Sequence, residues 1–239
     1  MNALVLAAGR GTRIAAAAGG VPKPLIPIAG RPVIVRTLDW LASAGIRDVW
    51  INLHHRPDDI RAALGDGSLF GVTIHYAFEP EILGTAGAFR ALATAFTETT
   101  LVVYGDNLVR FDLSPFFEAH RKSGARATVA LFDPDRHPNS RIAGGRVALN
   151  GNARVTSFVE GASIHGLVNA GVYLLEPGFA TAIPPGFQDF GRDVLPGQLA
   201  SGDVSGYLID PAGYCLGLDT PESLRNAEEL IATNQVALA

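Results

Sequence analysis

Short, mostly apolar runs alternate along the front half of the chain with segments in which apolar residues recur every three or four positions. The short runs predict strands at residues 2–8, 49–53, 72–76, 101–104 and 127–131. The helical spacing predicts helices at residues 32–44, 57–64, 85–96 and 114–123. Pro32 suits the first position of a helix that Gly45 ends, and Ser114 before Pro115 suits an N-cap. Strands and helices in alternation predict a mostly parallel sheet with helices on both faces.

After Asp133 the pattern changes to shorter β-rich runs. Runs at residues 146–149 and 154–159 flank Asn150-Gly151-Asn152, and Asn-Gly between such runs is typical of a β-hairpin. We also expect a strand at 167–175, a short helix within 187–199, a short strand at 206–209 and a helix at 221–235. The prediction is an α/β fold of the Rossmann-like, doubly wound kind with antiparallel β insertions. Its ligands would lie beyond the carboxyl ends of the strands, in a cleft between the two halves.

Composition and charge exclude several classes of protein. Apolar residues make up 48% and charged residues 18%, and the net charge is −4 without any basic run, which argues against a nucleic-acid partner. No apolar stretch approaches the ~20 residues of a membrane-spanning helix, and the N-terminus lacks a basic n-region. The single cysteine, Cys215, fits a reducing compartment and a buried apolar position. We expect a cytoplasmic protein that binds neither nucleic acid nor membrane.

A glycine-rich loop, Gly9-Arg-Gly-Thr-Arg13, follows the first strand, and Lys23 stands between two prolines a few residues later. This spacing indicates a phosphate site. A dinucleotide fold is disfavoured because Ile14 replaces the third glycine and no acidic residue ends the second strand. The P-loop pattern, in which a lysine and then a serine or threonine directly follow the last glycine, is absent. A tight turn with two solvated arginines is the alternative interpretation of the loop, and an exposed loop lysine that of Lys23.

The wider stretch, Leu6-Ala-Ala-Gly-Arg-Gly-Thr-Arg13 followed by Pro22-Lys-Pro-Leu25, resembles the signature of the sugar-1-phosphate nucleotidyltransferases. Further motifs follow in the family's order: Glu79-Pro-Glu-Ile-Leu-Gly-Thr-Ala-Gly-Ala88, Tyr104-Gly-Asp106-Asn107, Phe158-Val-Glu160, Val168-Asn169-Ala-Gly171 and Phe190-Gly-Arg-Asp193-Val-Leu-Pro196. The resemblance implies the nucleotide-diphospho-sugar transferase fold over a single domain, residues 1–239. Residues 1–132 would bind a nucleoside triphosphate and residues 133–239 a sugar-1-phosphate, which are joined with release of pyrophosphate.

This reaction requires charge neutralisation rather than a side-chain base, because the attacking sugar phosphate has a second pKa near ~6 and is mostly dianionic at neutral pH. In the roles that the resemblance implies, Arg13 braces the β- and γ-phosphates and Lys23 bridges the two reacting phosphates. Asp106, which follows an apolar strand, would hold Mg²⁺. The family's second metal-binding aspartate falls at Gly217, so we assign that role to Asp219, with a helix N-cap ahead of Pro221 as the alternative.

The nucleotide-binding residues are assigned from the same motifs. They are Leu6, Ala8, Gly9, Gly11, Thr12, Glu79, Gly84 and Thr85. Uracil- and thymine-using members commonly carry Gln at the position of Glu79. Guanine presents N1–H beside N2–H₂, two donors that an ionised carboxylate accepts together. Glu79 therefore favours GTP and a likeness to mannose-1-phosphate and heptose-1-phosphate guanylyltransferases; the alternative is a solvent-facing Glu79 and a base read by the backbone.

The rear half departs from the family pattern at the sugar phosphate. Asn107, Glu160, Asn169 and Arg192 are the expected sugar-binding residues. Where the family has a Glu-Lys pair whose lysine holds the phosphate, this chain has Glu160-Gly161, so Lys23, Arg192 or His165 would have to replace that lysine. The alternatives to a guanylyltransferase are a uridylyl- or thymidylyltransferase and a catalytically idle regulatory relative that binds nucleotide sugars. The sequence leaves the sugar and a homodimer open, and the scattered histidines argue against zinc.

Overall fold

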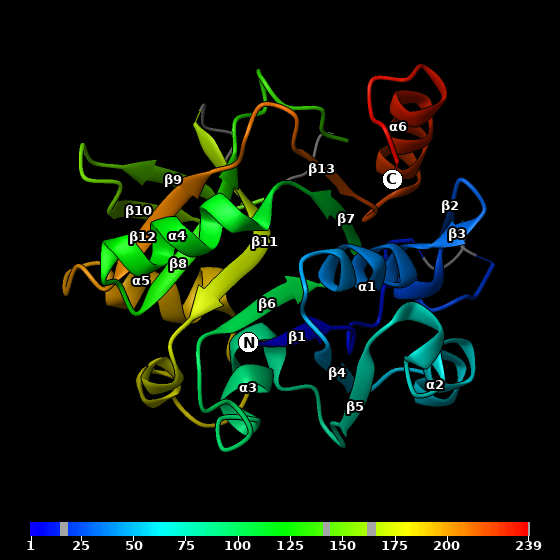
Figure 1. The fold of residues 1–239 in the computed structure, drawn as a ribbon, viewed down its shortest axis with the longest axis horizontal. Coiled ribbons are helices and arrows are strands. Elements are labelled where there is room, and N and C mark those ends of the chain that lie inside the picture. Colours follow the sequence, from blue (N-terminus) through cyan, green and yellow to red (C-terminus); the bar gives the residue numbers. More distant parts are fainter. Residues whose placement is uncertain (15–18, 141–143, 162–165, 239) are drawn as a thin grey trace.

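The front half of the chain builds a parallel sheet (Figure 1). The computed structural model describes residues 1–14, 19–140, 144–161 and 166–238. Four parallel strands lie in the order β6-β1-β4-β5; their bounds are Asn2–Leu6 for β1, Asp48–Leu53 for β4, Thr73–Phe78 for β5 and Thr100–Tyr104 for β6. Ala3, Leu4 and Val5 of β1 are fully buried, as expected of a central strand with both faces covered. The predicted parallel sheet is confirmed.

The rear half adds the antiparallel part of the same sheet. Strand β11, Leu167–Leu175, runs antiparallel to β6 and carries the rear strands beyond it. Those strands are β8 (Ala127–Phe132), β9 (Arg146–Leu149), β10 (Val155–Val159) and β12 (Val204–Leu208). Strands β9 and β10 form the predicted hairpin, although the left-handed residue of its turn is Ala153, with φ +57°, and not the glycine. Within the described residues this makes one mixed sheet of nine strands.

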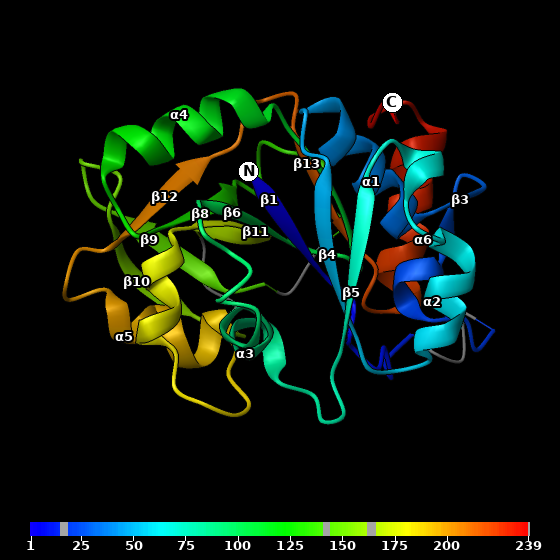
Figure 2. The same ribbon diagram turned by 60° about the horizontal axis from the view of Figure 1, so that its bottom comes forward.

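Helices cover both faces of the sheet, as predicted (Figure 2). One face carries α1 (Val33–Ser43), α2 (Pro57–Leu64) and α4 (Leu113–Ser123), and the other carries α3 (Gly84–Ala91) and α5 (Leu195–Gln198). Strand β1 serves both cores, because Ala3 and Val5 face the first set of helices and Leu4 and Leu6 the second. The doubly wound arrangement leaves the carboxyl ends of the parallel strands at one edge.

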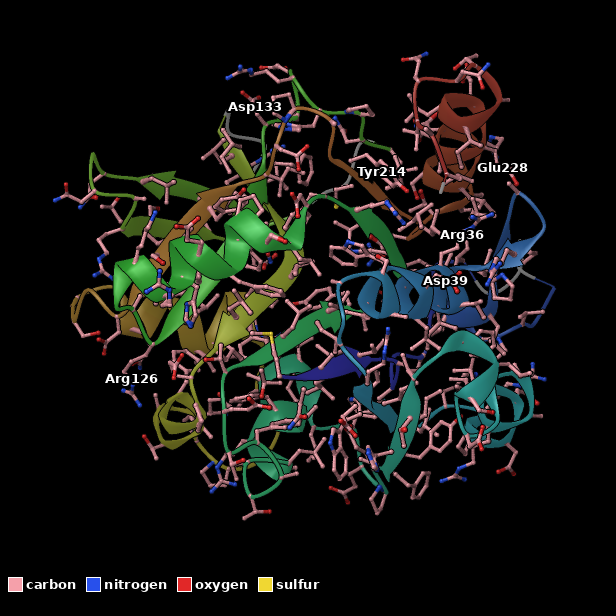
Figure 3. All side chains as sticks on the ribbon, viewed as in Figure 1. Arg36, Asp39, Arg126, Asp133, Tyr214 and Glu228 are labelled. Carbon is pink, nitrogen blue, oxygen red and sulfur yellow. The ribbon has the colours of Figure 1, made fainter. Side chains whose placement is uncertain are left out.

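A small second sheet joins the C-terminal segment to the loop after β6, and the sequence pattern did not reveal it. Strand β7, Asn107–Arg110, pairs antiparallel with β13, Tyr214–Gly217, and helix α6, Pro221–Ala232, follows. A short hairpin of β2 (Pro27–Ile28) and β3 (Arg31–Pro32) packs with them. Figure 3 labels Arg36 on α1 and Tyr214 on β13, which lie where α1 approaches the small sheet. The Arg36 guanidinium donates to the carbonyl of Ile28 at 2.8 Å, which ties the hairpin to α1.

Several predicted helix boundaries were wrong. Pro32 is the N-cap of α1 and not its first residue. Helix α4 begins at Leu113 because the Asp112 carboxylate accepts the amide of Ser114, so Ser114 is not the cap. The predicted helix 85–96 ends at Ala91, and the segment 187–199 holds a π-turn, Phe190–Val194, before α5. Short 3₁₀ turns, which were not predicted, occur at Lys23–Leu25, Ser68–Phe70 and Pro177–Ala182.

Among the helices in the described part of the chain, none has both the length and the apolar character needed to cross a bilayer. The longest, α6, is 12 residues long, well short of the ~20 that a span requires.

Candidate active site

A cleft of about 220 Å³ opens where the parallel strands β1, β4 and β6 end. The glycine loop, the loop 79–85 and the loop 187–189 complete its walls. The lining residues are Leu6, Ala8, Gly9, Asn52, Glu79, Ile82, Gly84, Thr85, Tyr104, Asp106, Phe187 and Asp189. Seven residues assigned from the sequence therefore meet in one cleft: Leu6, Ala8, Gly9, Glu79, Gly84, Thr85 and Asp106. Thr12 is exposed and is not among the lining residues.

At one end of the cleft the ammonium of Lys23 joins two carboxylates. Its Nζ donates to Asp106 Oδ2 and to Asp219 Oδ1, both at 2.7 Å, and the lysine side chain is only 5% exposed. Burial by itself lowers the pKa of Lys23, but the charges of Asp106 and Asp219 outweigh burial and raise that pKa above its ordinary value. The interpretation of Lys23 as an exposed loop lysine is therefore wrong.

Asp219 belongs to this charge cluster and does not cap α6. The N-cap of that helix is Thr220, whose hydroxyl accepts the amide of Ser223 in a capping box. The Asp219 carboxylate accepts instead from Lys23 and, at 3.2 Å, from the guanidinium of Arg13. The Arg13 side chain is largely exposed, so it lies on the solvent side of the charge cluster.

Asp106 and Asp219 are two carboxylates held close together by one cation, Lys23. Among the described residues, no group of three or more His, Cys, Asp or Glu side chains is arranged to hold a metal ion. Mg²⁺ commonly takes one or two carboxylates and fills its other positions with substrate phosphates and water. Asp106 and Asp219 would supply the two carboxylates, and phosphates and water the remaining ligands.

Glycine is required at two places where the backbone approaches the site. Gly11 has φ +56°, and a Cβ there would lie 3.0 Å from the Cβ of Lys23. Gly84 has φ +75°, and a Cβ there would lie 2.4 Å from the carbonyl oxygen of Gln188. The side chain of Thr85 also joins these loops, since its hydroxyl contacts Asp189 Oδ1 at 3.2 Å and accepts the amide of Phe190 at 2.9 Å. These contacts hold the loops that form the cleft walls.

Glu79 is buried on the cleft, so the expectation of a solvent-facing Glu79 in the alternative is wrong. Its side chain accepts two protein donors: Asn52 Nδ2 at Oε1, 2.7 Å away, and the amide of Leu83 at Oε2, 3.0 Å away. Sequence reasoning missed Asn52, although a polar residue near the end of an otherwise apolar strand was a signal that could have identified it. Phe187 and Asp189 were also missed, because they come from a loop far away in the sequence.

The four residues expected to bind the sugar differ in their surroundings. Burial and then the charge of Asp189 raise the pKa of the Glu160 carboxyl, although Arg192 opposes this. Asn169 uses its amide within β11, donating to the hydroxyl of Tyr173 and accepting the amide of Gly171. Asn107 lies in β7 opposite Gly217 and is 9% exposed.

Among the described residues near Gly161, none is a free cation that could replace the missing lysine of the Glu-Lys pair. Gly161 has φ +71°, a conformation that a lysine there would adopt only with strain. Arg192 is paired with Asp193 at 2.8 Å and with Asp189 at 3.4 Å, and its guanidinium lies 5.5 Å from the ring centre of Phe187. His165 lies outside the described residues. Of Lys23 and Arg192, the two candidates that the structure describes, Lys23 pairs with Asp106, which lines the cleft.

The doubly wound sheet and the cleft at its strand ends define a Rossmann-like α/β protein with a glycine loop at the ligand-binding edge of the sheet. The family model described as Nucleotidyl transferase matches residues 2–234. The chain belongs to the nucleotidyl transferase family, and its likeness to the sugar-1-phosphate nucleotidyltransferases is confirmed.

Relatives within the family differ in the nucleotide that their names give. The chain is 34% identical to the mannose-1-phosphate guanylyltransferase of Mycobacterium tuberculosis over 236 residues, 97% of this chain and 65% of that protein. It is 32% identical to the UTP–glucose-1-phosphate uridylyltransferase of Synechocystis over 219 residues, 84% of this chain and 56% of that protein. The chain thus spans less than two thirds of either relative.

A shorter relative and a solved structure match along their whole lengths. The D-glycero-alpha-D-manno-heptose 1-phosphate guanylyltransferase of Aneurinibacillus thermoaerophilus is 27% identical over 233 residues, 96% of this chain and 97% of that protein. The crystal structure of HddC from Yersinia pseudotuberculosis complexed with GMP-PN superposes with a TM-score of 0.81 at 23% identity, over 96% of this chain and 99% of that chain. At that identity the superposition confirms the fold alone.

Proposed function

We propose that this chain transfers a guanylyl group from GTP to a sugar-1-phosphate and releases pyrophosphate. The observation that carries the proposal is a cleft lined by both a buried carboxylate, Glu79, and Asp106, the carboxylate that Lys23 pairs with. The two guanylyltransferases among the relatives support it. Residues 1–132 would hold the nucleotide, and residues 133–239 the sugar.

The chemistry depends on the neutralisation of charge. The attacking sugar phosphate is already a dianion near neutral pH, so no protein base has to remove a proton. Lys23 would neutralise the two phosphates between which the bond forms, and Arg13 the departing pyrophosphate. Asp106 and Asp219 would hold Mg²⁺, which supplies further neutralisation of the triphosphate when it is bound. The glycine loop offers backbone N–H groups to phosphate oxygens.

The choice of GTP rests on Glu79. Its carboxylate lies on the cleft wall and each of its oxygens retains a lone pair beyond the protein hydrogen bond it accepts. Guanine offers N1–H and N2–H₂ in parallel to such a group. A pyrimidine carbonyl opposite it would be left unpaired, which costs about 1–3 kcal/mol.

Two other functions have specific support. The relative of Synechocystis, 32% identical, is named a uridylyltransferase, which favours UTP. Gly161 in place of the phosphate-holding lysine, together with the pairing of Arg192 to two aspartates, favours an idle protein that binds nucleotide sugars.

The deciding experiment is a pyrophosphate-release assay with Mg²⁺, the triphosphates GTP, UTP and dTTP, and mannose-1-phosphate, glucose-1-phosphate and a heptose-1-phosphate. We expect kcat/KM for GTP to exceed that for UTP and dTTP by at least about tenfold, the effect of one unpaired polar group. Glu79→Gln should reduce this preference. A wild type that prefers UTP or dTTP contradicts the proposal. Tight binding of a GDP-sugar without any turnover would support the idle relative.

A further inference from the structure

Asn52, at the end of β4, is oriented by the backbone of β1. Its Oδ1 accepts the amide of Ala7 at 2.8 Å, and its Nδ2 donates to Glu79 Oε1 at 2.7 Å. An amide N–H can only donate, so the contact with Ala7 identifies which end of the carboxamide is oxygen. Asn52 is 3% exposed, and it lines the cleft beside Glu79.

Asn52 has a second N–H to offer. A carboxamide nitrogen carries two hydrogens, and in the part of the chain that the structure describes Asn52 Nδ2 makes one hydrogen bond, to Glu79. Leu6 and Ile82 are among the apolar residues that line the cleft together with Asn52. A buried N–H beside such a space gains a partner when a ligand brings an acceptor.

The hydrogen bonds fix the polarity at position 79 as well. Asn52 Nδ2 and the amide of Leu83 each donate to one oxygen of Glu79. An amide side chain at position 79 would set its own N–H group against one of these donors. The pair therefore presents a donor at Asn52 next to acceptors at Glu79. Neither position can exchange donor for acceptor without loss of a hydrogen bond to the other or to the backbone.

We propose that Asn52 is a second base-reading residue, which donates its remaining N–H to O6 of guanine while Glu79 accepts N1–H and N2–H₂. The inference rests on the proposed use of GTP and adds the residue that discriminates among purines. Adenine carries an amino group in place of O6 and an unprotonated N1. The amino group would set a donor against the Asn52 N–H, and N1 an acceptor against the Glu79 carboxylate. Uracil matches Asn52 and Glu79 with O4 and N3–H, but its O2 faces the second oxygen of Glu79.

The experiment exchanges the donor at position 52 and the acceptor at position 79. In the double variant Asn52→Asp, Glu79→Gln, the new amide at position 79 donates to the new carboxylate at position 52. Its oxygen accepts the amide of Leu83, so the hydrogen bonds between the two side chains and to the loop remain. The pair then presents an acceptor to the amino group of adenine and a donor to its N1. We measure kcat/KM for GTP, ITP and ATP with one sugar-1-phosphate, and the Kd of each triphosphate by calorimetry.

The wild type should prefer GTP to ATP, and Asn52→Asp alone should lose about ten- to a hundredfold for GTP. The double variant should shift the GTP/ATP ratio toward ATP by about a hundredfold or more, because two contacts change sign. Asn52→Thr, which keeps one acceptor for Ala7 and one donor for Glu79 without adding charge, should lose GTP preference in the same direction. Glu81→Gln, on the exposed part of the same loop, is the control for charge and should leave the ratio unchanged.

A GTP/ATP ratio that stays within about twofold of the wild type in folded Asn52→Thr and in the double variant would overturn this inference, because the lost contact should cost tenfold or more. If the wild type prefers GTP, such a result leaves the proposed guanylyl transfer intact. If the wild type itself prefers UTP or dTTP, the proposed function fails first and the inference fails with it.

Discussion

The Nζ of Lys23 lies 2.7 Å from Oδ2 of Asp106, although 83 positions separate the two residues in the sequence. Asp219, from the far end of the chain, accepts from the same nitrogen. The lysine is nearly inaccessible, whereas each carboxylate is about a third exposed. One cation thus compensates two anions at the end of the cleft, and each of the three side chains depends on the other two.

Replacement of Lys23 by Met should abolish most turnover. We expect kcat to fall about 10²- to 10³-fold, the usual loss for a single electrostatic contact in a transition state. The free energy of unfolding should also fall, on the order of 1–3 kcal/mol, because Asp106 loses the cation it pairs with and Asp219 keeps only the exposed Arg13. Lys122→Met is the control, since that lysine is exposed and pairs only with Glu118 among the ion pairs of the described residues. A Lys23→Met variant with more than about a tenth of the wild-type rate contradicts the catalytic role.

Mg²⁺ should stabilise Lys23→Met more than the wild type when no nucleotide is present. In the wild type the ammonium already compensates Asp106 and Asp219, whereas in the variant a divalent cation can take that place. Binding to the folded state alone raises Tm by mass action. Thermal unfolding with and without Mg²⁺ at about a hundredfold excess over its Kd should show a rise of several degrees in the variant. Equal shifts in both proteins would argue against Asp106 and Asp219 as the metal-binding pair.

Asp219 and Thr220 are neighbours with separable roles. Asp219→Asn should raise the Mg²⁺ concentration for half-maximal rate by at least about tenfold, as removal of even an outer-shell partner of a metal commonly does. Thr220→Ala removes the capping hydroxyl of α6 and should cost about 1 kcal/mol, or roughly 2–4 °C in Tm. Mg²⁺ titrations and melting curves of both variants check the division. If Asp219→Asn lowers Tm and leaves the titration unchanged, the second ligand lies elsewhere.

Gly84→Ala should disturb the cleft more than a change of backbone preference explains. The added Cβ would meet the carbonyl of Gln188 at 2.4 Å, and that carbonyl accepts the amides of Ala86 and Gly87. Gly45 has a similar φ of +82° with open space around its position, so Gly45→Ala isolates the conformational cost of about 1–2 kcal/mol. Gly84→Ala should exceed that loss and also raise KM for the triphosphate. Equal losses in urea unfolding would show that the close contact with Gln188 is unimportant.

Cys215 should be inert in the folded protein. Its thiol is fully buried in β13, and burial raises the pKa of Cys215 well above its usual range. Because the thiolate is the reactive form, a thiol reagent at pH 8 should modify no residue in buffer and one residue per chain in urea. Rapid modification in buffer would mean that β13 opens readily from β7.

The sequence by itself determined the sheet and its ligand-binding edge. Apolar runs at residues 2–8, 49–53 and 101–104 predicted buried strands, and the helices between them indicated parallel order. The glycine loop and Lys23 were also recognisable from the sequence, because the glycines free the backbone of the loop and the prolines beside Lys23 restrict it locally. What these patterns describe is local, namely which faces are buried and where the backbone turns.

Only the tertiary structure decided which distant groups meet. The pairing of β7 with β13 depends on a partner far along the chain, and neither segment has a distinctive pattern of its own. The sequence left Asp219 between a helix cap and a member of the charge cluster; the hydroxyl of Thr220 caps α6, which leaves the carboxylate free for Lys23. Asn52 and Glu79 acquire their fixed polarity only because β1 and the loop 79–85 bring donors to them. Hydrogen bonds between remote residues depend on strand register and packing, which no periodicity in one segment encodes.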